Sequence, residues 1–293
     1  MIVRSPLRLA AFVSVLLAAL PALAVAEEGE TLDPSQEFAL EPYVSLHLGP
    51  LDMSINKAVV YMMLSSLLCI GFGLWVVRKG LDPKPGGGQN VLELAYEFSE
   101  EQIAKPTLPE GTFKRYFPYV ATLFLFVAIN NLISFIPLPM AHEGDLFGTG
   151  LKDLGLYAAT ANINVTLALA ALSFVIFNFE GVRAHGVVGY FKNLIPDAPG
   201  AIKPFIFALE MLSTLLRLVS LSVRLFANLL AGHLLIIMCA GFTILLGSVA
   251  GVAALPVGAF FYVFEMLLVA GLQAFIFAML TGLYIGFAVE AGH

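Results

Sequence analysis

Long hydrophobic runs without charged residues alternate with shorter polar stretches along this chain. Such runs cover residues 58–77, 116–141 and 154–179, and a nearly continuous one covers 204–288. About 20 apolar residues form a helix that crosses a bilayer, so the last run must hold at least two crossings. Glycines and a proline within 247–256 predict the break between them. The pattern predicts an all-α, polytopic membrane protein with five principal membrane helices.

The composition agrees with this pattern and narrows the kinds of partner. Hydrophobic residues make up 59% of the chain and charged residues 12%, which is more apolar surface than a soluble core can bury. The formal net charge of -6 leaves no basic surface, which argues against a nucleic-acid partner. Cys69 and Cys239 lie far apart and match neither a disulfide framework nor a metal site. The sequence contains no phosphate-binding loop, so we expect neither a nucleotide nor another cofactor.

The first 26 residues have the features of a cleaved secretory signal. Arg4 and Arg8 precede an uncharged run at 9–20, and small residues end in Ala-Val-Ala before Glu27. These are the basic, hydrophobic and cleavage-site regions of a signal peptide. We expect cleavage, with the mature chain starting near Glu27 on the outside of a bacterial inner membrane. A retained first membrane helix is the alternative.

Lysine and arginine are concentrated in two segments, and this asymmetry predicts the orientation. Residues 78–115 and 180–203 hold nine of them, whereas the other loops hold only Lys57 and Lys152. Because basic loops stay in the cytoplasm, these two segments are predicted to be cytoplasmic. The acidic stretch 27–52 then lies outside the membrane, and the C-terminus lies inside.

These features divide the chain into six segments. They are a signal peptide (1–26), an outside segment (27–56), a first membrane helix with a cytoplasmic linker and an amphipathic helix (57–115), a membrane hairpin (116–182), a cytoplasmic loop (183–203) and a long hairpin (204–293).

Within the first cytoplasmic segment, the glycine-rich linker DPKPGGGQN precedes an amphipathic stretch at 91–104. An acidic face such as this one does not suit lipid headgroups. We interpret the stretch as an interfacial helix that meets another subunit, with a solvated helix as the alternative. Its apolar residues gather near one helical face, and glutamates cover the remainder: Val91, Leu94, Ala95, Phe98 and Ile103 against Glu93, Glu97, Glu100 and Glu101.

Amide and hydroxyl side chains occur at membrane depth in two motifs. Asn130 and Asn131 precede LISFIPLP, and Asn162, Asn164 and Thr166 lie in TANINVTLALAAL. Such groups usually join membrane helices through hydrogen bonds, which is our interpretation here. A water-lined passage is the alternative.

Ionisable residues form a stripe in the last hydrophobic run. Glu210, Arg217 and Arg224 recur every seven residues, so they share one face of a helix. Asn228 extends this face, whereas His233, nine residues after Arg224, points about 180° away. A single helix therefore offers a cation on one side and an imidazole on the other.

The helix that carries this stripe is too long to stand upright in a bilayer. Residues 205–238 would form about 51 Å of helix, against a hydrocarbon core of about 30 Å. We therefore expect a steep tilt, a kink or a path close to the membrane plane.

An arginine at the centre of a bilayer costs from about 2.5 to more than 10 kcal/mol. Arg217 can pair with Glu210 or reach the interface, but Arg224 has no obvious partner in this chain. A salt bridge to Glu210 through Arg217 is one explanation. A partner supplied by another protein is the explanation we favour.

Four ordered motifs run through the membrane part of the chain. NNLISFIPLP and TANINVTLALAAL are followed by LSVRLFANLLAGHLL at 221–235 and GLQAFIFAMLTGLY at 271–284. Together they resemble subunit a of the rotary F-type ATP synthase. In that family an Arg is followed four residues later by an Asn, then by Ala-Gly-His or Ala-Gly-Glu, and further downstream by Leu-Gln-Ala. The resemblance covers about 116–284, and the N-terminal part agrees only in general layout.

The resemblance implies that the last hairpin lies tilted against a rotating ring of c subunits, with peripheral-stalk b subunits and a catalytic head as further partners. Arg224 matches the family's essential arginine, which faces the carboxylates of the ring. Because arginine cannot deprotonate, it attracts these carboxylates and separates two proton half-channels. Proton flow turns the ring and drives ATP synthesis in the head, so the chain is expected to be a non-catalytic translocating subunit.

The resemblance also implies roles for residues around this arginine. Asn228 and Gln273 match polar residues that lie beside it, and Glu210 matches an acid on the release side. His233 and Glu265 match a pair that relays protons.

Three positions depart from the family pattern. Leu218 stands in place of a common proline and should straighten the helix, and Ala227 stands in place of a common glycine. Glu265 lies eight residues before Gln273, where the family has seven. In an ideal helix the extra residue turns Glu265 about 100° away, unless a bulge intervenes.

Two other classes of protein compete with this interpretation. A transporter or channel could bind an anion at Arg224, but the chain lacks the internal repeat that many transporters carry. A purely structural assembly protein fits poorly with so many ionisable residues in the membrane.

Overall fold

The computed structural model describes residues 42–45, 47–48, 51–52, 54–80, 82–83, 86–136, 157–193, 202–245 and 248–290. The predicted signal peptide, 1–26, lies outside these residues. Within the described part, five helical segments are long and apolar enough to cross a membrane. The predicted class, an all-α polytopic membrane protein with five principal membrane helices, is confirmed.

In the described residues, four short strands precede the first membrane helix. They form two antiparallel pairs, β1 (Pro42–Val44) with β4 (Ile55–Asn56) and β2 (His47–Leu48) with β3 (Leu51–Asp52). The side chain of Asn56 accepts a hydrogen bond from the amide of Val59 and so caps α3 (Lys57–Arg78).

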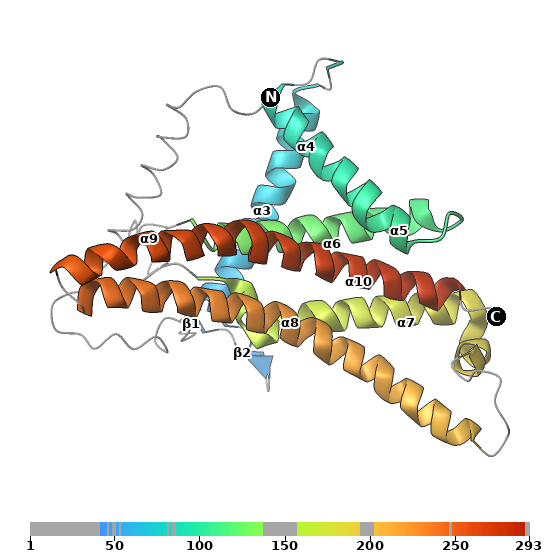
Figure 1. The fold of residues 1–293 in the computed structure, drawn as a ribbon. Coiled ribbons are helices and arrows are strands. Elements are labelled where there is room, and N and C mark those ends of the chain that lie inside the picture. The colour runs from blue at the N-terminus through green and yellow to red at the C-terminus, as the bar shows by residue number, and fades with distance from the viewer. Residues whose placement is uncertain are drawn as a thin grey trace.

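The rest of the described chain is mainly helical. After α3 come α4 (Gly87–Phe98), the π-helix η1 (Ser99–Ala104), α5 (Lys105–Thr107), α6 (Phe113–Ile133), the 3₁₀ turn η3 (Ala159–Ala161), α7 (Ile163–Asn193), α8 (Lys203–Leu245), α9 (Ser248–Phe264), the π-helix η4 (Glu265–Val269) and α10 (Ala270–Glu290). In Figure 1, α10 packs along α6 and α7, while α8 lies beside α9 and diverges from α10 towards its own N-terminal end.

The length of α8 confirms that this helix exceeds one upright crossing. Its 43 residues span about 65 Å at 1.5 Å per residue, roughly twice the hydrocarbon thickness. It runs unbroken through Leu218, as expected for a position without proline. The predicted break at 247–256 extends too far, because α9 begins at Ser248 and contains Pro256. Membrane helices tolerate an internal proline where neighbouring groups satisfy the freed carbonyl.

The bounds of α7 also differ from the predicted hydrophobic run. The helix begins at Ile163 rather than at 154, and it continues to Asn193, into the predicted loop 183–203. A kink at Gly186, with φ of 72°, redirects its last turns. The Tyr190 hydroxyl then donates to Asn178 Oδ1 at 2.7 Å, which ties the redirected end to the straight part of the helix.

The amphipathic stretch 91–104 is not a single regular helix. The π-helix η1 interrupts it, and an added residue per turn rotates the buried face. Ile103 of η1 is fully buried, whereas Val91 and Leu94 of the predicted apolar face lie on α4, which has no buried residue, and are exposed. Where the following helix α5 meets α10, a side chain at Gly282 or Gly286 would collide with Thr107, so glycine permits the close contact.

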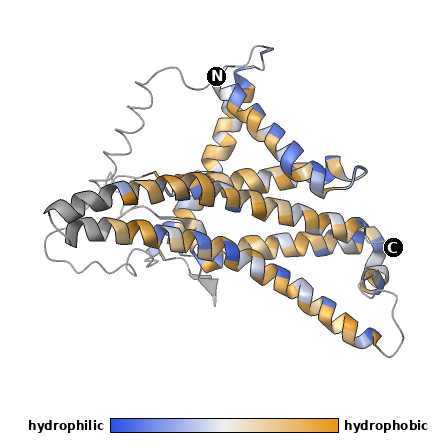
Figure 2. Cartoon of the chain, in the orientation of Figure 1, coloured by the Kyte–Doolittle hydropathy of each residue, from blue (hydrophilic) through white to orange (hydrophobic). Residues whose placement is uncertain are grey.

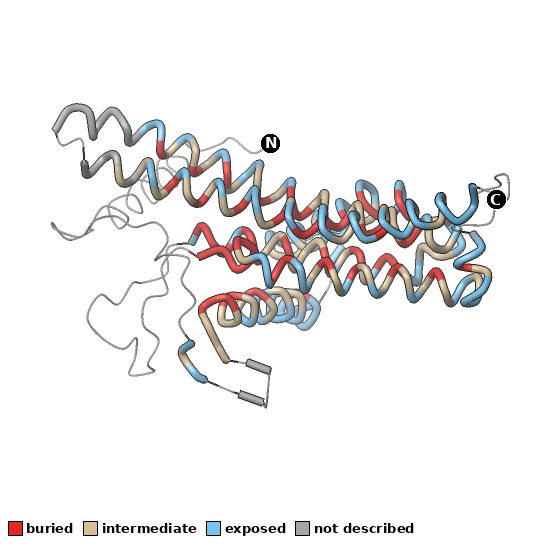
Figure 3. Tube along the Cα trace, turned by 90° about the horizontal axis from the view of Figure 1, so that it is seen from below, coloured by how far each residue is buried: buried red, intermediate tan, exposed pale blue. Residues whose placement is uncertain are grey.

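The core lies between the helices, and their outer faces are apolar. Buried positions follow the sides on which the helices face one another (Figure 3), including Leu225 and Leu229 of α8 and Ala274 and Phe277 of α10. Hydrophobic residues also cover most of the helical surface, while hydrophilic ones gather on α4, near helix ends and midway along α8 (Figure 2). An apolar exterior of this kind suits a bilayer.

Candidate functional site

Glu210 and Arg217 form an ion pair in the N-terminal half of α8. Arg217 Nη2 lies 3.3 Å from Glu210 Oε1. The side chain of Arg217 is 33% exposed and that of Glu210 is 38% exposed. The guanidinium also lies over the Tyr284 ring of α10, 5.5 Å from its centroid. The shared helical face predicted from the seven-residue spacing is therefore present in the structure.

Arg224 lies two turns further along α8 and is half-buried. Its Nη2 donates to the hydroxyl of Ser220 at 3.4 Å. Among the described residues, no carboxylate lies within 4.0 Å of it. Glu210, the nearest acid on α8, lies 14 residues away and pairs with Arg217. Asn228, one turn later, is exposed. Asn228 thus lies on a part of α8 that the described residues leave exposed, and Arg224 lies at its border.

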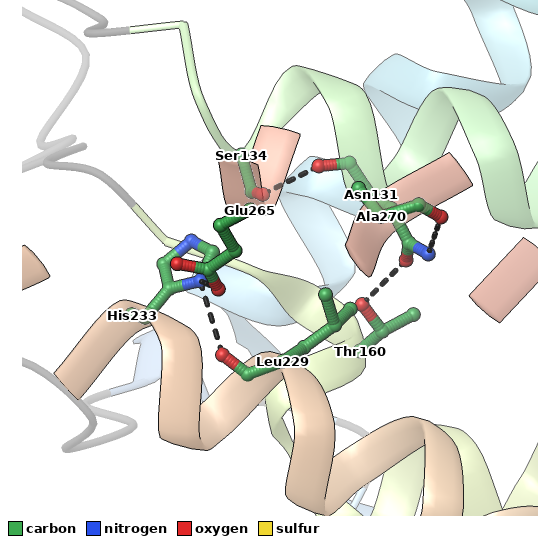
Figure 4. A network of polar contacts seen from close by, with 7 residues as sticks. All are labelled: Asn131, Ser134, Thr160, Leu229, His233, Glu265 and Ala270. Atoms are coloured by element: carbon green, nitrogen blue, oxygen red, sulfur yellow. Dashed lines mark hydrogen bonds and ion pairs between the residues drawn. The ribbon is translucent and has the colours of Figure 1, made fainter. Parts of the chain in front are cut away.

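His233 and Glu265 form a buried pair between α8 and η4. Nδ1 of His233 lies 3.3 Å from Glu265 Oε1, and the side chains are only 5% and 3% exposed. The same nitrogen lies 3.1 Å from the carbonyl oxygen of Leu229 (Figure 4). Since a carbonyl can only accept a hydrogen bond, Nδ1 carries a proton.

Two atoms of this pair remain available for a further proton. His233 Nε2 and Glu265 Oε2 are buried and have no hydrogen-bond partner among the described residues. The ring of Phe135 packs against the imidazole at a centroid distance of 5.0 Å, and the Tyr262 hydroxyl donates to the Phe135 carbonyl. The aromatic ring of Phe135 thus covers one side of the pair.

The π-helix η4 resolves the conflict over the spacing of Glu265. It starts at Glu265, and the amide of Ala270 donates to the Glu265 carbonyl five residues earlier. A π turn accommodates one extra residue. Glu265, eight residues before Gln273, therefore points in the direction that a residue seven before Gln273 would have in a regular helix. The bulge that the sequence left open is present, and it brings Glu265 to His233.

Gly232 supplies the space for this carboxylate. A Cβ atom at this position would overlap the carboxylate of Glu265. Gly232 lies in the Ala-Gly-His motif, and nothing in the sequence by itself indicates this role. The reason for glycine there is visible only when α9 and η4 are placed against α8.

Buried amides next to this pair join helices, as the sequence predicted. Asn131 Nδ2 donates to the carbonyl of Ala270 at 3.0 Å, and its Oδ1 accepts from Thr160 at 2.8 Å. Asn130 Oδ1 accepts from Ser65 of α3 at 3.2 Å. Thr160 is the first residue of TANINVTLALAAL, and nothing in the sequence distinguishes it from the other polar residues of that motif.

The amides of the second motif behave differently. Asn162 Oδ1 accepts from the amide of Asn164 at 2.8 Å, which is a local turn contact at the start of α7. Thr166 reaches the hydroxyl of Ser222 at 3.2 Å and so links α7 to α8. Only part of this motif therefore joins helices.

Gln273 is buried in α10, with 7% of its surface exposed. No hydrogen bond connects it to Arg224 within the described residues, so the predicted proximity of these two residues gains no support from a direct contact. Its burial shows that it faces the helices of this chain rather than lipid.

Comparison with known proteins decides the family. The family described as ATP synthase A chain matches residues 59–286. The chain belongs to the ATP synthase A chain family. The match begins before α6, so the similarity extends further towards the N-terminus than the quoted motifs indicate. It includes α3, which the sequence analysis related to the family only in general layout.

Bacterial members of the ATP synthase A chain family align with most of this chain. ATP synthase subunit a of Bradyrhizobium diazoefficiens is 34% identical over 271 residues, covering 89% of this chain and 99% of the relative. That of Hyphomonas neptunium is 34% identical over 267 residues, covering 89% and 97%. ATP synthase subunit a 2 of Chlorobaculum tepidum is 34% identical over 262 residues, covering 86% and 69%. The chain is accordingly a multi-pass bacterial membrane protein of this family.

Proposed function

We propose that the chain is subunit a of an F-type ATP synthase and conducts protons through two half-channels separated by Arg224. Proton flow turns a ring of c subunits, and the rotation drives ATP synthesis in a separate catalytic head. The chain itself is non-catalytic, works with peripheral-stalk b subunits and binds no nucleotide. Family membership supports the complex in which it acts, and the polar groups along α8 support the mechanism.

The observation that carries the proposal is the order of polar groups along α8. Glu210 lies 14 residues before Arg224 and His233 lies nine after it, about 21 and 14 Å along a helix. Each of the outer two has its own partner, whereas no acid in the described chain pairs with Arg224. Ionisable groups in membrane segments usually mark ion pathways. Two separate groups flanking an unpaired arginine are what two half-channels require.

His233 and Glu265 form the uptake side in this mechanism. A proton from outside binds at Nε2 or Oε2, the two atoms that lack a hydrogen-bond partner in the part of the chain that the structure describes, and is passed on to a ring carboxylate. An imidazole is a proton carrier rather than a ligand for alkali cations, which supports H⁺ as the transported ion. The short separation of 3.3 Å lets the pair share one proton.

Arg224 keeps the two sides apart. An ionised ring carboxylate is attracted to its fixed positive charge, and a protonated one is released to rotate into the lipid. Each unit charge that crosses 100 mV contributes about 2.3 kcal/mol to this cycle. The proton leaves by the side that holds Glu210, whose pairing with Arg217 keeps an acid and a base partly exposed there.

The direction of transport follows from the proposed orientation. With the signal peptide removed, the N-terminus lies outside, α4 lies in the cytoplasm and the C-terminus is cytoplasmic. A single cysteine tests this orientation in a background that lacks Cys69 and Cys239. Gly87→Cys suits the purpose because a side chain there meets no atom within 4 Å. We expect an impermeant thiol reagent to label it only from the cytoplasmic side, and labelling from outside would reverse the assignment of the half-channels.

Arg224→Ala tests the central claim. In membrane vesicles carrying the assembled synthase, we expect this variant to abolish proton-driven ATP synthesis and to raise passive proton leak, since the fixed charge between the half-channels is lost. Arg183→Ala is the matched control, because that arginine is exposed on α7 and lies as far as 4.0 Å from Glu180. Normal ATP synthesis in Arg224→Ala would falsify the proposal.

A further inference from the structure

The π-helix η4 directs Glu265 towards His233, so whatever stabilises η4 controls the site. A π turn is less favourable than an α turn, and such turns persist where an additional interaction fits them. The contact that meets this requirement lies at the C-terminal boundary of η4, where the segment joins α10 at Ala270.

Asn131 of α6 reaches this boundary from outside the helix. Its Nδ2 donates to the carbonyl of Ala270 at 3.0 Å, next to the amide of Ala270 that closes the π turn. Both residues are 0% exposed. A hydrogen bond in so buried a place has no competing water and holds its partner firmly.

Thr160 fixes the orientation of the Asn131 carboxamide. Its hydroxyl donates to Asn131 Oδ1 at 2.8 Å, which turns Nδ2 towards Ala270 (Figure 4). Thr160 is also fully buried and lies in η3, just ahead of α7. Three segments that are distant in the sequence therefore meet at this one boundary.

We propose that Asn131 is a positioning residue, which holds η4 in its π-helical form and thereby keeps Glu265 against His233. Thr160 supports it by orienting the carboxamide. The consequence for proton uptake rests on the proposed function of the His233 and Glu265 pair, whereas the effect on geometry does not.

Disulfide formation measures the geometry without relying on proton transport. A Cβ at Gly232 would overlap the Glu265 carboxylate, so Gly232→Cys with Glu265→Cys places two thiols close enough to bond. In a background lacking Cys69 and Cys239, mild oxidation followed by a polyethylene glycol maleimide shift on a gel reports the fraction joined. We expect fast bonding in this pair. Adding Asn131→Leu should slow it by about 10-fold, because a regular helix turns position 265 by about 100°.

Deletion of Leu268 sharpens the test. Leu268 is exposed within η4, and its removal leaves Glu265 seven residues before Gln273, the spacing that a regular helix needs. In the deletion background Asn131→Leu should no longer slow disulfide formation. If the slowing persists after the deletion, Asn131 acts by another route and the inference is wrong.

Two further variants guard against a trivial result. Thr160→Val removes the orienting hydroxyl while keeping the shape of the side chain, and we expect a slowing of about 3-fold that the deletion also cancels, as for a lost net hydrogen bond. Asn130→Leu is the matched control, since the adjacent amide contacts Ser65 of α3 and not η4. It should change the disulfide rate by less than about 2-fold. An equal effect of Asn130→Leu and Asn131→Leu would contradict a specific role for Asn131.

ATP-driven proton pumping then links the geometry to the function. Asn131→Leu should lower the pumping rate by about 10-fold, since a displacement of about 1 Å can cost up to 100-fold. It should add nothing in a Glu265→Gln background, because both changes disable the same group. If Asn131→Leu slows disulfide formation but Glu265→Gln pumps protons at the normal rate, the proposed relay is contradicted and the positioning role stands. Unslowed disulfide formation in Asn131→Leu would contradict the positioning role and leave the relay intact.

Discussion

Two pairs of a basic and an acidic side chain lie on opposite sides of Arg224 along α8, and they differ in burial and in origin. Glu210 and Arg217 are 38% and 33% exposed, whereas Glu265 and His233 are 3% and 5% exposed. The first pair is made within one helix, and the second joins two segments 32 residues apart. An exposed pair can exchange protons with water in many arrangements, but a buried one depends on a single geometry.

This difference predicts how strongly each side responds to mutation. Ion pairs with access to water contribute little individually, because solvent can replace either partner. A desolvated pair has no such substitute, and its atoms must stay within hydrogen-bond reach. The uptake side should therefore be sensitive to changes that the release side tolerates.

The largest effect is expected from loss of the buried pair itself. His233→Ala and Glu265→Gln should each slow ATP-driven proton pumping by about 100-fold, as for groups that transfer protons. The double variant should be no slower than the worse single variant, because the two act as one unit. Passive leak should stay low in all three, since Arg224 is intact. Multiplicative losses in the double variant would mean that the two residues act independently.

A smaller effect should follow when the pair is displaced rather than removed. Gly232→Ala adds a methyl group that overlaps the Glu265 carboxylate, and we expect pumping to fall by about 10-fold. Gly271→Ala is the control, because a Cβ there meets no atom within 4 Å. Both variants replace a helical glycine by alanine, so the gain in helix propensity is the same in both and does not affect the comparison of their pumping rates. Equal rates in the two variants would show that the space at Gly232 does not matter for transport.

The smallest effect is expected on the exposed side. Arg217→Gln should lower the rate of proton transfer through the Glu210 side by about 3-fold, since a partly solvated ion pair contributes little. Arg217→Lys should recover most of this loss, because it keeps the charge near Glu210. The rate of ATP-driven pumping in the two variants provides the measurement. A loss as large as that of Glu265→Gln would remove the distinction between the two sides.

The sequence alone determined the layout of the membrane helices and the stripe on α8. The length of a hydrophobic run that can cross depends only on bilayer thickness, so the runs themselves were sufficient to count five membrane helices. The pairing of Glu210 with Arg217 follows from a seven-residue spacing, since two turns of a regular helix bring such residues to one face. Local periodicity is sufficient wherever both partners lie on one continuous helix.

Tertiary structure decided what local periodicity could not. The sequence placed Glu265 one residue out of register with Gln273, and it left open whether a bulge corrects this. Helix type at η4 is a small difference in backbone energy, which a contact from α6 is able to reverse. The kink at Gly186, which redirects the end of α7, and the π-helix η1 at 99–104 were likewise not predicted from the sequence. The sequence thus carried the chemical groups, and packing between distant segments decided which of them meet.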